Sequence, residues 1–193
     1  DVDNNGLPDV FLTSNFEENK LYLNKTRPGT DELKFEDVTK KAGITNKKFW
    51  STGVTFADVN GDGWLDIYVC NSGSRDERGN QLFINQGVKN GIPQFVEKAK
   101  EYGLWDGGFS THAAFFDYDR DGDLDMYLLN NSFTPMDRLQ YANIRETRDK
   151  LGGDKLFRND GSRFTDVSAQ AGIYGSLIGF GLGITIGDVN NDN

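Results

Sequence analysis

One pattern of acidic and amide residues recurs along the chain, with the form Asp-x-[Asp/Asn]-x-[Asp/Asn]-Gly-x-x-Asp. Complete copies begin at Asp1, Asp58 and Asp117, and an incomplete copy begins at Asp188. Side-chain oxygens at alternate positions of a tight loop can turn toward a common centre, and calcium prefers about six to eight oxygen ligands. The pattern therefore predicts a calcium site in each complete loop.

Each loop is expected to supply side-chain oxygens from its first, third, fifth and ninth residues, and a backbone carbonyl from its seventh. The predicted ligands are Asp1, Asp3, Asn5, Leu7 and Asp9 in the first loop, Asp58, Asn60, Asp62, Trp64 and Asp66 in the second, and Asp117, Asp119, Asp121, Asp123 and Asp125 in the third. The fourth copy offers Asp188, Asn190 and Asp192, and it has Asn193 where the other copies have glycine. That glycine permits the positive φ of a sharp turn.

Three other interpretations of these loops fit the sequence less well. An EF-hand requires a glutamate at the twelfth position and flanking helices, but that position holds Leu12, Val69 or Leu128 within strand-like sequence. Magnesium demands stricter octahedral geometry, which makes calcium the better fit. Asp, Asn and Gly also favour turns that bind no metal. One shared register in all complete copies favours calcium, because carboxylates this close repel one another without a cation.

The sequence between the loops repeats as well. Each loop is followed by short β-branched and aromatic runs separated by Gly, Asn and Asp, which predict strands joined by turns. Each period of 57–71 residues holds four such runs, and tandem four-stranded units are typical of β-propeller blades. We therefore predict an all-β fold, a partial β-propeller of about three blades, each a four-stranded antiparallel sheet.

The repeats divide the chain into parts of one propeller domain. Residues 1–49 are predicted to be the end of a blade, 50–105 a full blade, 106–177 a full blade with a helical insert at 132–153, and 178–193 the start of the next blade. Propellers close with about four to eight blades. We therefore expect the remainder of a longer chain to close the ring.

The composition narrows the class of partner. The chain has 193 residues and a net charge of −9, which argues against a nucleic-acid partner. Its apolar runs are too short for a membrane span in this segment. The single cysteine, Cys70, excludes an internal disulfide framework.

The loops, the Asn-x-Leu-Phe/Tyr-x-Asn runs and the Phe-x-Asp-Val-Thr/Ser runs before Ala-Gly-Ile together resemble the FG-GAP (VCBS-type) repeats of integrin-α-like β-propellers. The resemblance is closest to cartilage acidic protein-like chains, which pair such repeats with an ASPIC/UnbV domain. It implies a calcium-bearing propeller in secreted or surface proteins. The metal ligands carry over at the first, third, fifth and ninth residues of the three complete loops.

The expected function is a non-catalytic, calcium-stabilised extracellular or cell-envelope propeller that binds a protein or glycan ligand through its blade faces, as in adhesion. One alternative is a lyase-like enzyme acting on polysaccharide, and another is a structural subunit of a surface assembly or filament. His112, the only histidine, could line a pocket on the propeller axis or be a hydrogen-bonded core residue. No partner constellation for it is visible in the sequence.

Overall fold

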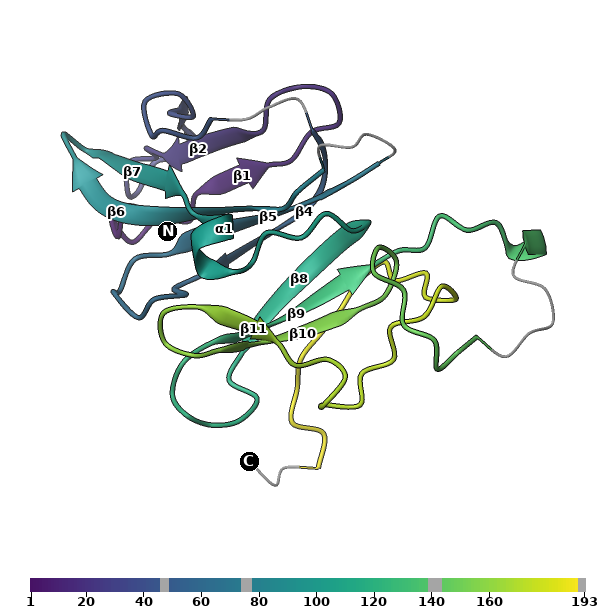
Figure 1. Cartoon of the computed structure of the whole chain (residues 1–193). Coiled ribbons are helices and arrows are strands. Elements are labelled where there is room, and N and C mark those ends of the chain that lie inside the picture. The colour runs from purple at the N-terminus through teal and green to yellow at the C-terminus, as the bar shows by residue number, and fades with distance from the viewer. Residues whose placement is uncertain (46–48, 74–77, 139–143, 191–193) are drawn as a thin grey trace.

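The computed structural model describes residues 1–45, 49–73, 78–138 and 144–190. Its strands form three antiparallel sheets that are layered one on another (Figure 1). The first sheet contains β1 (Val10–Leu12), β2 (Lys20–Asn24) and β3 (Phe35–Asp37); the second contains β4 (Trp50–Ala57), β5 (Asp66–Ser72), β6 (Gln81–Lys89) and β7 (Ile92–Glu97); the third contains β8 (Ser110–Phe116), β9 (Asp125–Asn130), β10 (Lys155–Asn159) and β11 (Phe164–Asp166). Each sheet follows chain order, which confirms the all-β prediction.

The middle strands of the second sheet are buried on both faces. Along β5, Ile67 and Val69 point into an apolar core shared with the first sheet. Tyr68 and Cys70 alternate with them and point into a second core shared with the third sheet. Successive side chains of a strand point to opposite faces, so one strand serves both cores. The sheets are therefore stacked face to face, as neighbouring propeller blades are.

Phe56, Phe115 and Ile186 occupy equivalent positions of the repeats, and the first two pack against a core. Phe56 packs against the core between the first and second sheets. Phe115 packs against the other core, where its ring meets Tyr68 edge-on at 5.9 Å between centroids. Ile186, the third equivalent residue, is 45% exposed.

The strands β4 and β8 lie against each other without forming a ladder. The Thr52 hydroxyl donates to the Ser110 carbonyl at 2.7 Å, and the Thr55 hydroxyl donates to the Ala113 carbonyl at 2.6 Å. Between them, a Cβ on Gly53 would lie 2.4 Å from the Thr111 carbonyl oxygen. Glycine is therefore required at position 53 for the close approach of the two strands.

Two sequence predictions need correction. The described residues of the insert at 132–153 form a surface excursion (Figure 1), but the helix among them is only the short 3-10 helix η1 (Met136–Arg138), and turns follow at 145–146 and 150–152. Asp149 favours the second of these turns, because its carboxylate accepts the Leu151 and Gly152 amides and so competes with a helical ladder. Residues 139–143 lie outside the described part.

The segment predicted at 178–193 as the start of the next blade contains no strand in its described part, residues 178–190. Residues 183–190 of the described chain have no ladder partner, and a strand needs a paired neighbour. One short helix was not predicted, α1 (Ala99–Tyr102), which ends at Gly103 with φ of 76°. None of the helices in the described part of the chain has the length and apolar character needed to span a bilayer.

Candidate metal centres

The three complete loops occupy equivalent places at one end of the sheets, which we name the loop end. The second loop joins β4 to β5, the third joins β8 to β9, and the first leads into β1. The ninth loop residue begins the following strand in two of them, where Asp66 pairs with Ala57 and Asp125 pairs with Phe116. The innermost strand and its neighbour therefore hold the two ends of the loop together.

All three loops adopt the same left-handed backbone at two positions. The sixth-position glycines Gly6, Gly63 and Gly122 have φ of 84°, 85° and 97°. A Cβ at these glycines would meet nothing within 4 Å, so they are needed for their φ and not for space. The fourth position is left-handed as well, a feature that the sequence analysis missed. It holds Asn4, Gly61 and Arg120, with φ of 53°, 69° and 62°.

The first and fifth residues of each loop hold the turn with side-chain oxygens. The first-position carboxylate accepts the amide of the sixth residue at 2.7 Å in the first two loops and 3.1 Å in the third. The fifth-position oxygen accepts the amide of the seventh residue at 2.8, 2.9 and 3.1 Å. These bonds place oxygens of both residues on the inside of the turn.

The ninth-position aspartate is fixed by two backbone amides. One of its oxygens accepts the amide of the second loop residue, as in the bond from Val59 to Asp66 at 3.0 Å. The other accepts the amide of an asparagine on the next strand, at 2.8 Å in every loop. These asparagines are Asn24, Asn85 and Asn159. The geometry of the ninth ligand thus comes from a residue outside the loop.

The same asparagines connect neighbouring loops. Each side-chain amide donates to the carbonyl of the eighth residue in its own loop. The Asn85 amide also donates to the Val2 carbonyl in the preceding loop at 2.9 Å, and Asn159 reaches the Val59 carbonyl at 3.4 Å. The final asparagine of the Asn-x-Leu-Phe/Tyr-x-Asn run was the sequence signal for this role.

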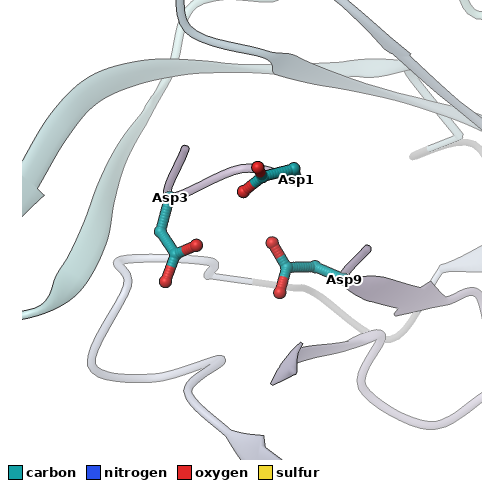
Figure 2. A group of neighbouring side chains, drawn as sticks. All are labelled: Asp1, Asp3 and Asp9. Carbon is teal, nitrogen blue, oxygen red and sulfur yellow. The ribbon is translucent and has the colours of Figure 1, made fainter. Parts of the chain in front are cut away.

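Carboxylates gather in the first and third loops. Asp1, Asp3 and Asp9 each place an oxygen within 4.8 Å of the others, and Figure 2 shows the three side chains around one space. Asp117, Asp119 and Asp125 form the equivalent group. Among the described residues, the second loop has no such group. Its third position is Asn60, whose amide donates to Asp62 at 2.9 Å.

One oxygen in the first loop has no hydrogen-bond partner although it is buried. The Asp3 side chain is 6% exposed, and its Oδ1 accepts no hydrogen bond. Its Oδ2 accepts from the Lys25 ammonium at 3.1 Å. A buried carboxylate oxygen that accepts no hydrogen bond destabilises the folded protein. The three carboxylates are therefore better suited to binding a cation than to being buried without one.

Burial and mutual repulsion disfavour the charged form of the loop carboxylates. Burial, with smaller contributions from Asp62 and Asp58, raises the pKa of Asp66 to about 6. Burial first and the Asp121 charge second raise the pKa of Asp123 to about 6. Burial also raises the pKa of Asp125. A divalent cation would offset both effects.

Several other predicted ligands do not lie within the two carboxylate groups. Asp123 was expected to offer only its carbonyl, but its side-chain Oδ1 is buried without a hydrogen-bond partner. It lines a cavity of about 210 Å³ that lies between the second and third loops. Asp188 and Asn190 are exposed, and Asp192 lies outside the described residues. His112 is half-buried on β8, opposite Leu129 of β9.

One of the comparisons with known proteins matches part of this repeat. A comparison of the chain with curated proteins found no match. Residues 1–69, which span the first two loops and the strands up to β5, match the family model described as an FG-GAP-like repeat. Residues 1–69 are therefore similar to an FG-GAP-like repeat, and they lie within an all-β fold that is consistent with a partial propeller.

Proposed function

We propose that the three complete loops bind calcium and that the chain is a non-catalytic binding segment of an extracellular or cell-envelope propeller. The observation that carries the metal proposal is the buried, unpartnered Oδ1 of Asp3 within a group of three carboxylates. The ion would be held by the side chains of the first, third, fifth and ninth loop residues. It would neutralise their charge and, in the second and third loops, tie β4 to β5 and β8 to β9.

The kind of site supports the extracellular part of the proposal. The loops are exposed turns at the surface, and calcium modules that work outside cells bind with dissociation constants of about 10⁻⁴–10⁻³ M. A site of this affinity is filled at extracellular calcium levels. The ligand bound by the propeller is proposed to be a protein or a glycan that docks on the faces or ends of the sheets.

Calorimetric titration of chelator-treated full chain with calcium tests the metal proposal. Saturable binding is expected, together with a rise in melting temperature, because an ion that binds only the folded state stabilises it. Magnesium at equal concentration should have a smaller effect. Asp3→Asn and Asp119→Asn should each weaken binding. Asp31→Asn changes an exposed carboxylate outside the loops and should not.

The absence of calcium uptake in this titration would overturn the metal proposal. Equal responses to calcium and magnesium would contradict the choice of ion. Ligand capture is a separate readout, because a propeller can bind a partner through side chains that contact no metal.

A further inference from the structure

The end of the sheets opposite the loops carries a second repeated position, which we name the junction position. It is the residue before β10 and its equivalents before β2 and β6, namely Asn19, Asn80 and Asp154. In all three, the side-chain Oδ1 accepts an equivalent backbone amide, from Ser14 at 2.9 Å, Asn71 at 2.8 Å and Asn130 at 2.8 Å. The repeat therefore fixes where this side chain lies.

In the first two sheets the junction asparagine bonds to the neighbouring sheet. The Asn19 amide donates to the Ser51 hydroxyl at 3.1 Å, and the Asn80 amide donates to the Ser110 hydroxyl at 2.9 Å. Asn80 also donates to the Tyr68 hydroxyl at 3.0 Å. Both asparagines are buried, at 2% and 0% exposure. The polar groups of these two junctions are thus satisfied within the protein.

The third sheet departs from this arrangement on both sides. Asp154 replaces the asparagine, and a carboxylate has no N–H group to donate. Gly181 stands seven residues before Asp188, where Ser51 and Ser110 precede their own loops by the same distance. The Tyr127 hydroxyl donates to Asp154 at 3.2 Å. Asp154 is half-buried, and its two observed bonds leave further acceptor capacity on the carboxylate.

A cavity of about 340 Å³ lies beside Asp154. Residues from three places in the chain form its wall, namely Arg145, Asp154, Tyr174, Ser176, Ile178 and Gly179. Arg145 comes from the excursion at 132–153, which the second sheet lacks. The volume lies at the lower end of the range of about 300–1,000 Å³ that is usual for small-molecule sites.

The excursion also holds the opposite wall in place. The Arg148 guanidinium donates to the Ile173 carbonyl at 2.6 Å and to the Asp154 carbonyl at 3.0 Å. The Asp149 backbone amide donates to the Gly175 carbonyl at 2.6 Å, which joins the excursion to the segment that follows β11. These bonds connect the excursion to both sides of the cavity, so the cavity is shaped before any ligand arrives.

The lining combines a strong acceptor, a strong donor and an aromatic ring. Asp154 accepts, Arg145 donates, and the Tyr174 ring is 66% exposed. Asp154 and Arg145 carry opposite charges, so this pair gives the lining no net charge that would select an anionic or a cationic ligand. Neighbouring hydroxyls on a sugar both donate and accept, and the apolar C–H face of a sugar can pack on an aromatic ring. A neutral, hydroxyl-rich ligand fits all three groups.

We propose that this cavity binds a neutral saccharide unit, with Asp154 and Arg145 bonding its hydroxyls and Tyr174 packing on its ring. The proposal deepens the binding function proposed above, and it requires no metal in the cavity. The comparison of the repeats supports the proposal. The third sheet lacks the hydrogen bond from the junction side chain to a serine of the neighbouring sheet, and Arg145 of the excursion lies beside the same cavity as Asp154.

The test is calorimetric titration of the full chain with neutral tetrasaccharides of glucose, galactose and mannose, and with galacturonate tetrasaccharide as the acidic arm. Saturable binding of at least one neutral sugar is expected. Asp154→Asn should weaken it about tenfold or more, because a charge-assisted hydrogen bond is lost. This variant installs the residue that the other two sheets use, so folding should be preserved. Tyr174→Ala should also weaken binding, and Tyr174→Phe should retain it.

Glu146→Gln is the matched control, because it removes the same charge from an exposed residue of the excursion that does not line the cavity. No binding of any neutral sugar, or binding unchanged by Asp154→Asn and Tyr174→Ala, would overturn the proposal. A preference for galacturonate would contradict the neutral class. Sugar binding by a chain that takes up no calcium would separate this proposal from the metal proposal.

Discussion

The two ends of the sheets differ in how closely the repeats agree. At the loop end, the first, fifth and ninth loop positions make the same kinds of hydrogen bond in all three loops. At the opposite end, Asn19 and Asn80 bond across to a serine, whereas Asp154 lines a cavity. Agreement among repeats marks what every sheet needs to fold. Asp154 keeps the hydrogen bond to the backbone but differs in side chain, and such a position is free to serve ligand binding.

The largest effect is expected at the loop end, from Asp66→Ala. Asp66 is fully buried, and its removal leaves the amides of Val59 and Asn85 without acceptors. The free energy of unfolding should fall by about 3–5 kcal/mol in calcium, measured by urea denaturation. Asp31→Ala, an exposed control, should change it by less than about 0.5 kcal/mol. A loss as small as the control's would show that the loop does not support the sheets.

A smaller effect is expected at the junction, and it should differ between sheets. Asn80→Ala removes the acceptor of the Asn71 amide and the donor to Ser110, so we expect a loss of about 2–3 kcal/mol. Asp154→Asn should cost less than about 0.5 kcal/mol, because asparagine keeps the oxygen that accepts the Asn130 amide. Urea denaturation of both variants measures the contrast. Equal losses would mean that Asp154 is a structural residue.

Much of the loop end could be predicted from the sequence, because its ligands lie within nine consecutive residues and repeat in one register. The role of Asn85 was harder to see, since its bonds to Asp66 and Val2 join residues far apart in the chain. Local spacing carries no information about such contacts.

The junction end was less predictable for a related reason. The run that begins at Asp154 was recognised as a repeat of those at Asn19 and Asn80, but its altered chemistry becomes visible only beside Arg145. The helical insert expected at 132–153 is replaced in its described part by η1 and turns, because local side-chain bonds and tertiary contacts override helix propensity.

The pH dependence of folding stability should differ between the metal-free and the calcium-bound protein. The raised pKa of Asp66, about 6, means that the metal-free fold is favoured by protonation. This contribution is fully present below the unfolded value near 4 and is lost as the pH rises through about 6. The free energy of unfolding of the metal-free chain should therefore fall by on the order of 1–2 kcal/mol between pH 5 and pH 7.

Calcium should reverse this trend, because the bound ion requires the carboxylates to be ionised. Thermal melts at pH 5, 6 and 7, with calcium and with chelator, measure both curves. The calcium-dependent rise in melting temperature should grow from pH 5 to pH 7. A rise of constant size across this range would contradict the assignment of Asp66 as a ligand.

The smallest effect is expected where the loops agree in backbone but differ in side chain. The fourth position is left-handed in every loop, yet it holds arginine in the third and glycine in the second. A left-handed conformation costs a residue with a Cβ roughly 1–2 kcal/mol. Replacing that residue with glycine removes this cost, but the greater freedom of glycine in the unfolded chain offsets part of the gain in stability. Arg120→Gly should therefore raise the free energy of unfolding by about 0.5–1 kcal/mol.

The reverse change, Gly61→Arg, should lower the free energy of unfolding by a similar amount, because it imposes the same backbone cost on the second loop. Urea denaturation of both variants in calcium measures the pair. If conformation governs this position, the two changes have opposite signs and similar size, and calcium affinity stays the same because the fourth residue is not a ligand. A loss of stability in Arg120→Gly would show that contacts of the Arg120 side chain outweigh its strained backbone. The loop end would then hold a side-chain difference between repeats that matters for folding, and the contrast with the junction end would be weaker than the hydrogen bonds indicate.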